Sequence, residues 1–412
     1  MRVDIVIIGD EILSGETYDS NSHSIVKKLT EIGIKTGRIT LVGDIKEEIS
    51  SAVKSALRKA DIVFTVGGLG MTGDDITKQV IAELLNKKME FNAELMEEVK
   101  AKYRKICMRK LTESMKGYGD VPAGSVMLPN SVGISPGILI TKGKKSVIML
   151  PGPPRELNAI IDEGIIPYLE KTLIHASYLK RIIRTTGTGE INLYEILKPV
   201  ISRWRSVSVS FLPNLKGVTI VLRMKNIKNR NAGRILDEKQ KEIVNHIKKY
   251  VYSLEDIELS EAVSRELIKK NLTISTAESC TGGSISSALT DISGSSAYFM
   301  NGVVCYSNES KIKILGVPKD IIEKYGAVSP QTARAMAENV RKISKTDIGI
   351  STTGVFGPTG GTQKKPVGLV YIGYADKNGT SVFKHNFGKK RERNKIRTTQ
   401  EALNLVRKKI LR

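Results

Sequence analysis

Cysteine, histidine and aromatic residues are scarce in this 412-residue sequence. The three cysteines, Cys107, Cys280 and Cys305, are odd in number and lack the spacing of metal ligands, which argues against a disulfide framework and a structural zinc. The four histidines are scattered, so a Ser-His-Asp triad is not expected. No apolar run has the length of a signal peptide or membrane span. We therefore expect a cytoplasmic protein without a membrane partner.

Positive charge is in excess, with a formal net charge of +22. The excess is concentrated in residues 171–250, with 17 basic and 5 acidic residues, and in residues 389–412, with 10 basic and 2 acidic residues. This pattern predicts an anionic substrate or partner and leaves nucleic acid open as one such partner. A solvated lysine-rich surface would give the same pattern.

Residues 1–170 alternate between apolar strands and amphipathic helical patterns. We expect strands at residues 3–9, 39–42 and 61–66, with Asp44 capping the helix after the second strand. This order predicts a parallel sheet with helices on both faces, in three layers. Such a sheet binds its ligands at the carboxyl ends of its strands.

Two groups of polar residues lie at that edge of the expected sheet. The glycine-rich loop after the third strand offers backbone N–H groups for a phosphate, and its candidate ligands are Gly67, Gly68, Gly70 and Thr72. The nearby carboxylates suit a divalent cation, and the candidates are Asp10, Asp74 and Asp75, with Glu11 beside them. Alternatively, Asp74 and Asp75 only cap the following helix.

The rest of the chain predicts two further parts. Residues 175–252 combine alternating strands with a basic helix at 234–250, which indicates a small α+β module. After an acidic linker at 253–258, residues 258–412 alternate again. Strands are expected there at 272–276, 303–306, 347–352 and 368–374, with a helix at 331–343. The last part therefore reads as a second α/β domain.

The last domain contains a strand-to-helix turn with three candidate nucleophiles, Ser279, Cys280 and Thr281. Because no histidine is close, the base would be a lysine, and Lys311 lies one turn from Tyr306. A second glycine-rich loop, at 354–361, can bind an anion, with positive charge from Arg391, Arg393 or Arg397. The competing interpretation is that the two hydroxyls cap a helix and that Cys280 is a core residue.

These motifs together resemble the competence/damage-inducible CinA family over essentially the whole chain. The N-terminal matches are GDEILSGETYDSNS (9–22), GGLGMTGDDIT (67–77) and LPGPPRE (150–156). The C-terminal matches are TAESCTGG (276–283), GSSAYFMNGVVCYSNESK (294–311), VSPQTA (328–333) and GVFGPTGG (354–361). The first domain also resembles molybdopterin-binding domains, the middle module a KH-type fold, and the last domain the stand-alone nicotinamide mononucleotide amidase PncC.

The resemblance implies two hydrolytic activities and a homodimer. The first domain would hydrolyse ADP-ribose with Mg²⁺, Mn²⁺ or Co²⁺, with K⁺ as a further candidate cation. The last domain would deamidate nicotinamide mononucleotide without a cofactor. The implied amidase roles are Ser279 as nucleophile, Lys311 as general base and Tyr306 assisting proton transfer. The implied substrate contacts are Thr281, Gly282, Gly283, Gly354, Gly357, Gly360 and Arg393.

Three features limit the transfer from the family. Met71 stands where the family commonly has proline, which predicts a less rigid phosphate loop. Phe356 stands where a smaller residue is usual, which predicts a narrower amidase pocket. The middle module has no GxxG loop, which argues against the usual KH mode of binding single strands. A nucleic-acid-associated protein and a molybdopterin-like ligand-binding protein without hydrolysis remain the alternatives.

Overall fold

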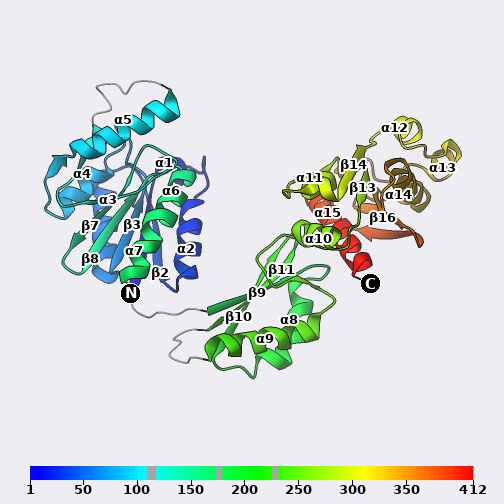
Figure 1. The fold of residues 1–412 in the computed structure, drawn as a ribbon, viewed down its shortest axis with the longest axis horizontal. Helices are drawn as coiled ribbons and strands as arrows, with labels where there is room; N and C mark the ends of the chain where they lie inside the picture. Colours follow the sequence, from blue (N-terminus) through cyan, green and yellow to red (C-terminus); the bar gives the residue numbers. More distant parts are fainter. Residues whose placement is uncertain (109–116, 173–178, 225–230, 412) are drawn as a thin grey trace. The chain divides into compact units, whose positions relative to one another are not determined.

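The computed structural model describes residues 1–108, 117–172, 179–224 and 231–411 (Figure 1). One compact unit is Met1–Leu179, the first domain. The other begins at Lys180 and contains both the middle module and the last domain, so these two parts form one compact body. The expected start of the module at residue 175 lies outside the described residues.

A six-stranded sheet is the centre of the first domain, in the order β2-β1-β3-β8-β7-β6, and β4 pairs with β5 separately. The strands are β1 (Arg2–Ile8), β2 (Lys35–Val42), β3 (Ile62–Val66), β4 (Met89–Phe91), β5 (Asp120–Pro122), β6 (Val126–Leu128), β7 (Gly137–Lys142) and β8 (Lys145–Leu150). The helices are α1 (Asp10–Leu13), α2 (Asn21–Glu31), α3 (Lys46–Lys59), α4 (Thr77–Leu84), α5 (Ala93–Cys107), α6 (Pro154–Ile160), the π-helix η2 (Ile161–Ile165) and α7 (Ile166–Thr172). Strands β2, β1, β3 and β8 are parallel to one another, whereas β7 pairs in the antiparallel direction with both β8 and β6. The sheet is therefore mixed at one edge.

Alternate side chains of β1 enter two different hydrophobic cores. Val3, Ile5 and Ile7 pack with residues of α2, α6, η2 and α7. Val6 and Ile8 pack on the opposite face with residues of α3, α4 and α5. Because every one of these β1 side chains is buried, the strand reads as a continuous apolar run. The three-layer α/β architecture expected from the sequence is confirmed.

The expected role of Asp44 as a helix cap is wrong. Helix α3 begins at Lys46, and its first turn has no side-chain cap. Asp44 instead exchanges hydrogen bonds with Asp10: the Asp10 amide donates to Asp44 Oδ2 at 3.0 Å, and the Asp44 amide donates to Asp10 Oδ1 at 3.4 Å. This pair ties together the chain segments that follow β1 and β2.

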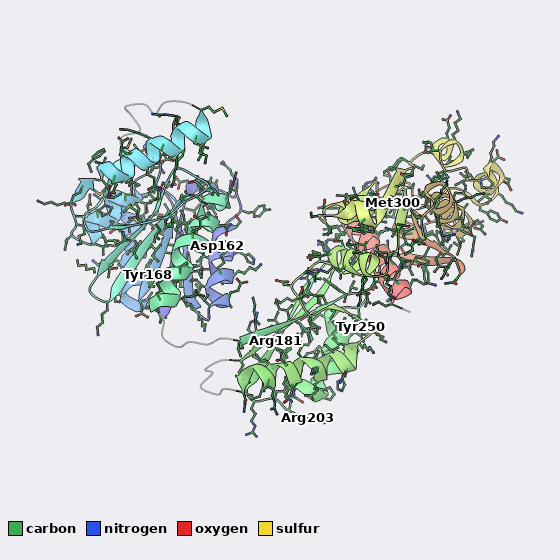
Figure 2. All side chains as sticks on the ribbon, in the orientation of Figure 1. Asp162, Tyr168, Arg181, Arg203, Tyr250 and Met300 are labelled. Carbon is green, nitrogen blue, oxygen red and sulfur yellow. The ribbon has the colours of Figure 1, made fainter. Side chains whose placement is uncertain are left out.

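The middle module consists of a four-stranded sheet in the order β10-β11-β9-β12 and two helices. The pairs β10–β11 and β9–β12 are antiparallel. Its elements are β9 (Leu179–Thr185), α8 (Glu190–Ile201), β10 (Val207–Asn214), β11 (Gly217–Met224), α9 (Ala232–Ile247) and β12 (Val251–Ser253). The sequence did not predict α8, whose pattern is interrupted by Pro199. Part of the positive charge is paired: Arg181 (labelled in Figure 2) bonds Asp237 at 2.7 Å, and Lys216 bonds Glu258 at 3.0 Å. The Arg181–Asp237 pair leaves the excess positive charge of residues 171–250 unchanged, because Asp237 is already counted among their acidic residues.

The last domain is built on a five-stranded sheet in the order β14-β13-β15-β16-β17. Its strands are β13 (Ile274–Glu278), β14 (Phe299–Val304), β15 (Ile348–Gly354), β16 (Leu369–Asp376) and β17 (Gly379–Asn386). Its helices are α10 (Leu259–Lys269), α11 (Ser284–Thr290), the 3-10 helix η3 (Ser295–Ala297), α12 (Asn308–Lys313), α13 (Lys319–Tyr325), α14 (Pro330–Ser344) and α15 (Arg391–Ile410). Strands β14, β13 and β15 are parallel, so their carboxyl ends meet at one edge. The strand expected at 303–306 begins and ends earlier, as β14.

Helix α15 joins the last domain to the middle module. Arg407 is 5% exposed and donates to the carbonyl oxygens of Val251 at 2.7 Å and Lys249 at 3.0 Å, and to Asn404 Oδ1 at 2.9 Å. Gln400 Nε2 donates to Thr186 Oγ1 at 3.2 Å. These polar contacts between α15 and the module explain why the two parts form one compact unit.

Replacing Arg407 with alanine should destabilise this unit by about 2–4 kcal/mol, because buried carbonyl groups lose their donors and a cavity opens. The measurement is the urea midpoint of unfolding, followed by far-UV circular dichroism. The matched control is Lys408→Ala, since Lys408 is the exposed neighbour on the same helix and should shift stability by less than about 0.5 kcal/mol. Equal midpoints for the two variants would contradict the role assigned to Arg407.

Within the described ranges, no helix combines the length and the apolar character needed to cross a membrane.

Candidate active sites

A cleft of about 420 Å³ lies at the carboxyl ends of the parallel strands in the first domain. It brings together most of the candidate residues that the sequence placed at this edge, and those in its lining are Glu11, Gly67, Gly68, Gly70, Asp74 and Asp75. Tyr18, Tyr118 and the segment 151–154 also belong to its lining. The sheet topology therefore collects the glycine-rich loop and the acidic residues into one cleft.

The backbone conformation of the glycine-rich loop requires glycine at positions 67 and 68. Both have positive φ, +106° and +66°, which favours glycine. A Cβ on Gly67 would clash with the carbonyl oxygen of Ile8, and one on Gly68 would clash with Thr77 Oγ1. The loop thus packs directly against the end of β1 and the start of α4.

Asp75 braces this loop from within. Its carboxylate accepts hydrogen bonds from the amides of Gly70 and Thr72, each at 2.8 Å, and from the Thr72 hydroxyl. The amide of Gly67 donates to the carbonyl oxygen of Leu150 at 3.0 Å. Three of the amide groups expected to hold a phosphate are therefore already bonded inside the protein. Met71, in the same loop, places the end of its side chain against Gly117.

The expected set of metal ligands does not converge. Asp75 is engaged by the loop amides and Asp10 by the amide of Asp44. Among the described residues, no group of three or more Asp, Glu, His or Cys side chains could hold a metal ion. Burial raises the pKa of Asp44, and the negative charges of Asp10, Glu11 and Asp74 raise it further. The cleft therefore has an acidic end, but a divalent cation held by Asp10, Asp74 and Asp75 alone does not fit.

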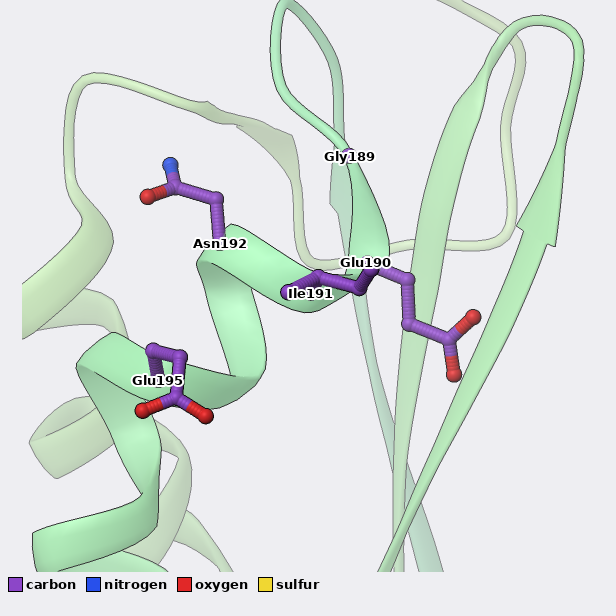
Figure 3. A pocket seen from close by; sticks show the side chains of 5 residues that line it. All are labelled: Gly189, Glu190, Ile191, Asn192 and Glu195. Carbon is purple, nitrogen blue, oxygen red and sulfur yellow. The ribbon is translucent and has the colours of Figure 1, made fainter.

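A hollow of about 580 Å³ lies at the start of α8 in the middle module (Figure 3). Its lining residues are Gly189, Glu190, Ile191, Asn192 and Glu195. The charged side chains in this lining are both carboxylates, which would repel a phosphate backbone. The hollow therefore gives no support to nucleic-acid binding by the module.

The edge of the last domain's sheet holds a serine and a buried lysine in direct contact. Ser279 follows β13, and Lys311 lies on α12, which follows β14. Lys311 Nζ is 3.1 Å from Ser279 Oγ, 2.9 Å from the carbonyl oxygen of Cys305 and 3.0 Å from that of Tyr306. Lys311 is 1% exposed, although it is a lysine on a short helix. The parallel topology thus assembles the serine–lysine pair that the sequence suggested.

Burial lowers the pKa of Lys311. The neutral amine has two N–H groups, one for each of the two nearest carbonyl oxygens. Its lone pair then faces the Ser279 hydroxyl, which can donate its proton to the nitrogen. Burial therefore favours the neutral, proton-accepting form of Lys311 relative to a lysine in water.

The other two candidate nucleophiles, Cys280 and Thr281, are less suitable than Ser279. Burial raises the pKa of the Cys280 thiol to about 12, so the thiolate is not available near neutral pH. Thr281 is fully buried, and its hydroxyl bonds the Thr352 hydroxyl at 2.7 Å. Of the three candidates that the sequence left open, only Ser279 lies against a base. The Thr281 hydroxyl is likewise directed into the protein rather than toward a ligand.

The positions of Tyr306 and of the candidate arginines do not match the roles expected of them. Tyr306 is 64% exposed, and its hydroxyl accepts a hydrogen bond from Arg391 Nη2 at 3.2 Å rather than contacting Ser279 or Lys311. Arg391 Nη1 also donates to the carbonyl oxygen of Gly357 at 3.2 Å. Arg393 is exposed. The guanidinium beside the glycine-rich loop is therefore that of Arg391.

The glycine-rich loop after β15 is fixed at its base and exposed at its tip. Phe356 is 3% exposed and packs in the hydrophobic core, so the expected narrowing of a pocket by this ring is not seen. Asn394, fully buried on α15, donates to the carbonyl oxygens of Phe356 at 3.1 Å and Gly388 at 2.8 Å. Gly354 and Gly357 lie in the braced part, whereas Gly360 is exposed. Only the tip of the loop is therefore open to a ligand.

Glu278 is a site residue that the sequence reasoning missed. Its carboxylate is fully buried and accepts from the amides of Ile285 at 3.1 Å and Ser286 at 2.8 Å, and from the Ser286 hydroxyl at 2.7 Å. It thereby caps α11 and fixes the Ser279–Gly283 turn, in which Gly282 and Gly283 have positive φ. The signal was available, because a charged residue at the end of a buried strand requires a partner.

Three family models match consecutive parts of the chain. Residues 4–171 match a probable molybdopterin binding domain, residues 180–253 the damage-inducible protein CinA KH domain, and residues 256–410 the CinA C-terminal domain. A crystal structure of the competence/damage inducible protein CihA from Agrobacterium tumefaciens is 37% identical in sequence and covers 39% of this chain and 99% of its own, with a TM-score of 0.36.

Relatives match over the full length as well. A competence-damage inducible protein of Acetivibrio thermocellus is 38% identical over 412 residues, covering 100% of this chain and 99% of its own. One from Clostridioides difficile is 39% identical over 414 residues, covering 99% of each chain. The order of the three domains agrees with these matches, and the chain belongs to the competence/damage-inducible CinA family.

Proposed function

We propose that the last domain is a serine–lysine amidase that converts nicotinamide mononucleotide to nicotinate mononucleotide and ammonia. The observation that carries this proposal is the contact between Ser279 Oγ and the buried Lys311 Nζ. The similarity of this domain to nicotinamide mononucleotide amidases supplies the substrate. Arg391 and the exposed tip of the loop after β15 supply positive charge and backbone amides for the substrate phosphate.

The proposed reaction starts from a neutral Lys311 amine beside the Ser279 hydroxyl. Neutral Lys311 accepts the hydroxyl proton as Ser279 Oγ attacks the carboxamide carbon. The tetrahedral intermediate collapses when the C–N bond breaks and Lys311 returns the proton to the leaving nitrogen, which departs as ammonia. Water, deprotonated by Lys311, then hydrolyses the acyl ester and restores the Ser279 hydroxyl.

The turn after Ser279 is suited to stabilise the oxyanion. The amide of Ser279 donates to Thr352 and that of Gly282 donates to the carbonyl oxygen of Ser279. In the described part of the chain, the amides of Cys280 and Thr281 have no such acceptor. These two groups are therefore the candidates to bind the developing negative charge.

The direct test is the release of ammonia from nicotinamide mononucleotide by the intact protein, with nicotinate mononucleotide identified by chromatography. Free nicotinamide and glutamine serve as control substrates, since neither carries both the ring and the phosphate. Activity should be unchanged by a chelator, because the pair needs no metal. A folded protein that releases no ammonia from the mononucleotide would contradict the assignment.

For the first domain we infer hydrolysis of ADP-ribose, on the basis of the cleft that combines a glycine-rich loop with an acidic end. Gly68 and Leu69 lie in its lining and provide backbone groups to a pyrophosphate. A divalent cation would supply charge neutralisation for the phosphates, and because the three carboxylates do not fit as its ligand set, no step is assigned to it. The alternative, binding without turnover, is the behaviour of a molybdopterin-like ligand-binding domain.

Replacing Asp75 with alanine should lower AMP formation from ADP-ribose by about 100-fold, because the amides of Gly70 and Thr72 lose their acceptor and the loop loses its shape. AMP is measured by chromatography with and without Mg²⁺, Mn²⁺ or Co²⁺. Glu47→Ala is the control, since Glu47 is exposed and lies outside this cleft. Saturable ADP-ribose binding without any AMP in the wild type would favour the ligand-binding alternative.

A further inference from the structure

A second cavity lies in the unit formed by the middle module and the last domain. It has a volume of about 220 Å³ and lies between the β10–β11 turn and helices α10, α11 and α15. Its lining residues are Lys216, Glu258, Leu259, Ser260, Ser284, Ala288, Lys395, Ile396, Thr399, Gln400 and Leu403. Neither Ser279 nor Lys311 is among these lining residues, so the cavity differs from the proposed amidase site in the residues that form it.

The surface that lines the cavity is mainly apolar, although hydroxyl, amide and charged side chains also contribute to it. Leu259, Ala288, Ile396 and Leu403 provide aliphatic surface. The volume is below that of sites for drug-sized ligands, so the occupant is about as large as a single substituted ring. An apolar wall of this size favours a compact hydrocarbon or aromatic body.

The charges at the cavity leave one cation without a carboxylate. Glu258 bonds Lys216 at 3.0 Å and Arg184 at 2.7 Å, and Arg184 also lies 3.5 Å from Asp256, so these four charges balance. Lys395 forms no ion pair with any residue in the described part of the chain. An occupant that carries one negative charge would therefore find its counter-ion in Lys395.

Lys395 also lies next to the turn that carries Ser279. Its Nζ is 3.9 Å from the position that a Cβ on Gly282 would take. Ser284 and Ala288, on α11, form the adjoining wall, and α11 begins directly after this turn. A ligand in the cavity would therefore contact the β10–β11 turn of the module on one side and the elements that hold the nucleophile on the other.

We propose that this cavity is a binding site for a monocyclic carboxylate, in which Lys395 binds the carboxylate and the aliphatic wall binds the ring. The apolar surface favours a ring over inorganic phosphate, and the ammonium group of Lys395, which is exposed, favours a carboxylate over a neutral ring of the same size. Occupation of the site stabilises the contact between the middle module and the last domain by linkage. The proposal concerns residues outside the proposed amidase chemistry and holds whether or not that chemistry is correct.

The test uses benzoate as the probe, titrated into the full-length Ser279→Ala protein and followed by isothermal calorimetry or by ligand-observed NMR. This protein lacks the proposed nucleophile, so the result does not depend on turnover. Benzoate should bind saturably, and benzyl alcohol and inorganic phosphate should bind at least tenfold more weakly. Lys395→Met should weaken benzoate binding at least tenfold, and Thr399→Trp, which fills the cavity, should abolish it.

The matched control is Lys377→Met, since Lys377 is an exposed lysine in the β16–β17 turn and should not affect binding. Melting temperatures of all variants establish that they are folded. The proposal is overturned if benzoate does not bind saturably, if binding survives both Lys395→Met and Thr399→Trp, or if phosphate binds as well as benzoate. Ammonia release by the wild type is measured separately, so that loss of one proposal leaves the other standing.

Discussion

Ser279→Ala should reduce ammonia release from nicotinamide mononucleotide by about 10⁴-fold or more, because the acyl-enzyme cannot form without the hydroxyl. The fold should be unaffected, since the Ser279 amide still donates to Thr352 and the carboxylate of Glu278 still caps α11. Initial rates of ammonia release and the melting temperature are the measurements.

The control for this variant is Ser287→Ala, because Ser287 is an exposed serine on the adjoining helix α11. It should retain wild-type activity. Substrate affinity of Ser279→Ala, measured by calorimetry, should remain within about threefold of the wild type, since Arg391 and the loop tip are intact. Substantial ammonia release by a folded Ser279→Ala protein would mean that the nucleophile is another group.

Lys311→Met should lower kcat by about 10³-fold, because Ser279 loses the group that accepts its proton. Methionine preserves much of the volume of the buried side chain, although the carbonyl oxygens of Cys305 and Tyr306 lose a donor. The matched control is Lys313→Met: Lys313 lies on the same helix, its side chain is 73% exposed, and it pairs with Glu309 at the surface. Since Ser279 and Lys311 act as one unit, the double variant should be no slower than the slower single variant.

The pH dependence tests the protonation state of Lys311. The rate should rise with pH through the lowered pKa of Lys311 and then level off, because only the neutral amine accepts the proton. A lysine in water would place this rise near pH 10.4. The same shift makes the free energy of unfolding increase with pH between the folded and unfolded pKa values, because the unfolded chain binds the proton more tightly there. A rate that is already falling in this range would contradict a lysine base.

Strands β1 and β3 could be predicted because they are buried on both faces and therefore appear as apolar runs. From the sequence, Ser279 was one of three candidate nucleophiles and Lys311 the candidate base, and the family resemblance paired them. The structure places both after the parallel strands β13 and β14 and in contact. Arg391 could not be distinguished from Arg393 in the same way, since the choice depends on which side of α15 meets the loop after β15.

The roles of several other polar residues depended on contacts that a sequence does not display. Asp75 has the chemistry of a metal ligand but is oriented toward the amides of its own loop. The Thr281 hydroxyl is directed to Thr352, a partner 71 residues away. The partners of Asp75 are amides only three and five residues away, whereas the partner of Thr281 lies on a distant strand, and the sequence shows neither choice.

The burial of Cys280 has a consequence for the resistance of the protein to oxidants. With its pKa raised to about 12, the thiol next to the nucleophile is ionised to about one part in 10⁵ at neutral pH. Peroxides and alkylating reagents attack the thiolate, so they would find almost none at this turn. Cys305 is also free and buried, and burial raises its pKa as well, whereas the side chain of Cys107 lies outside the described part of the chain. An amidase that uses the Ser279 hydroxyl beside this shielded thiol would keep working under oxidative stress that inactivates cysteine hydrolases.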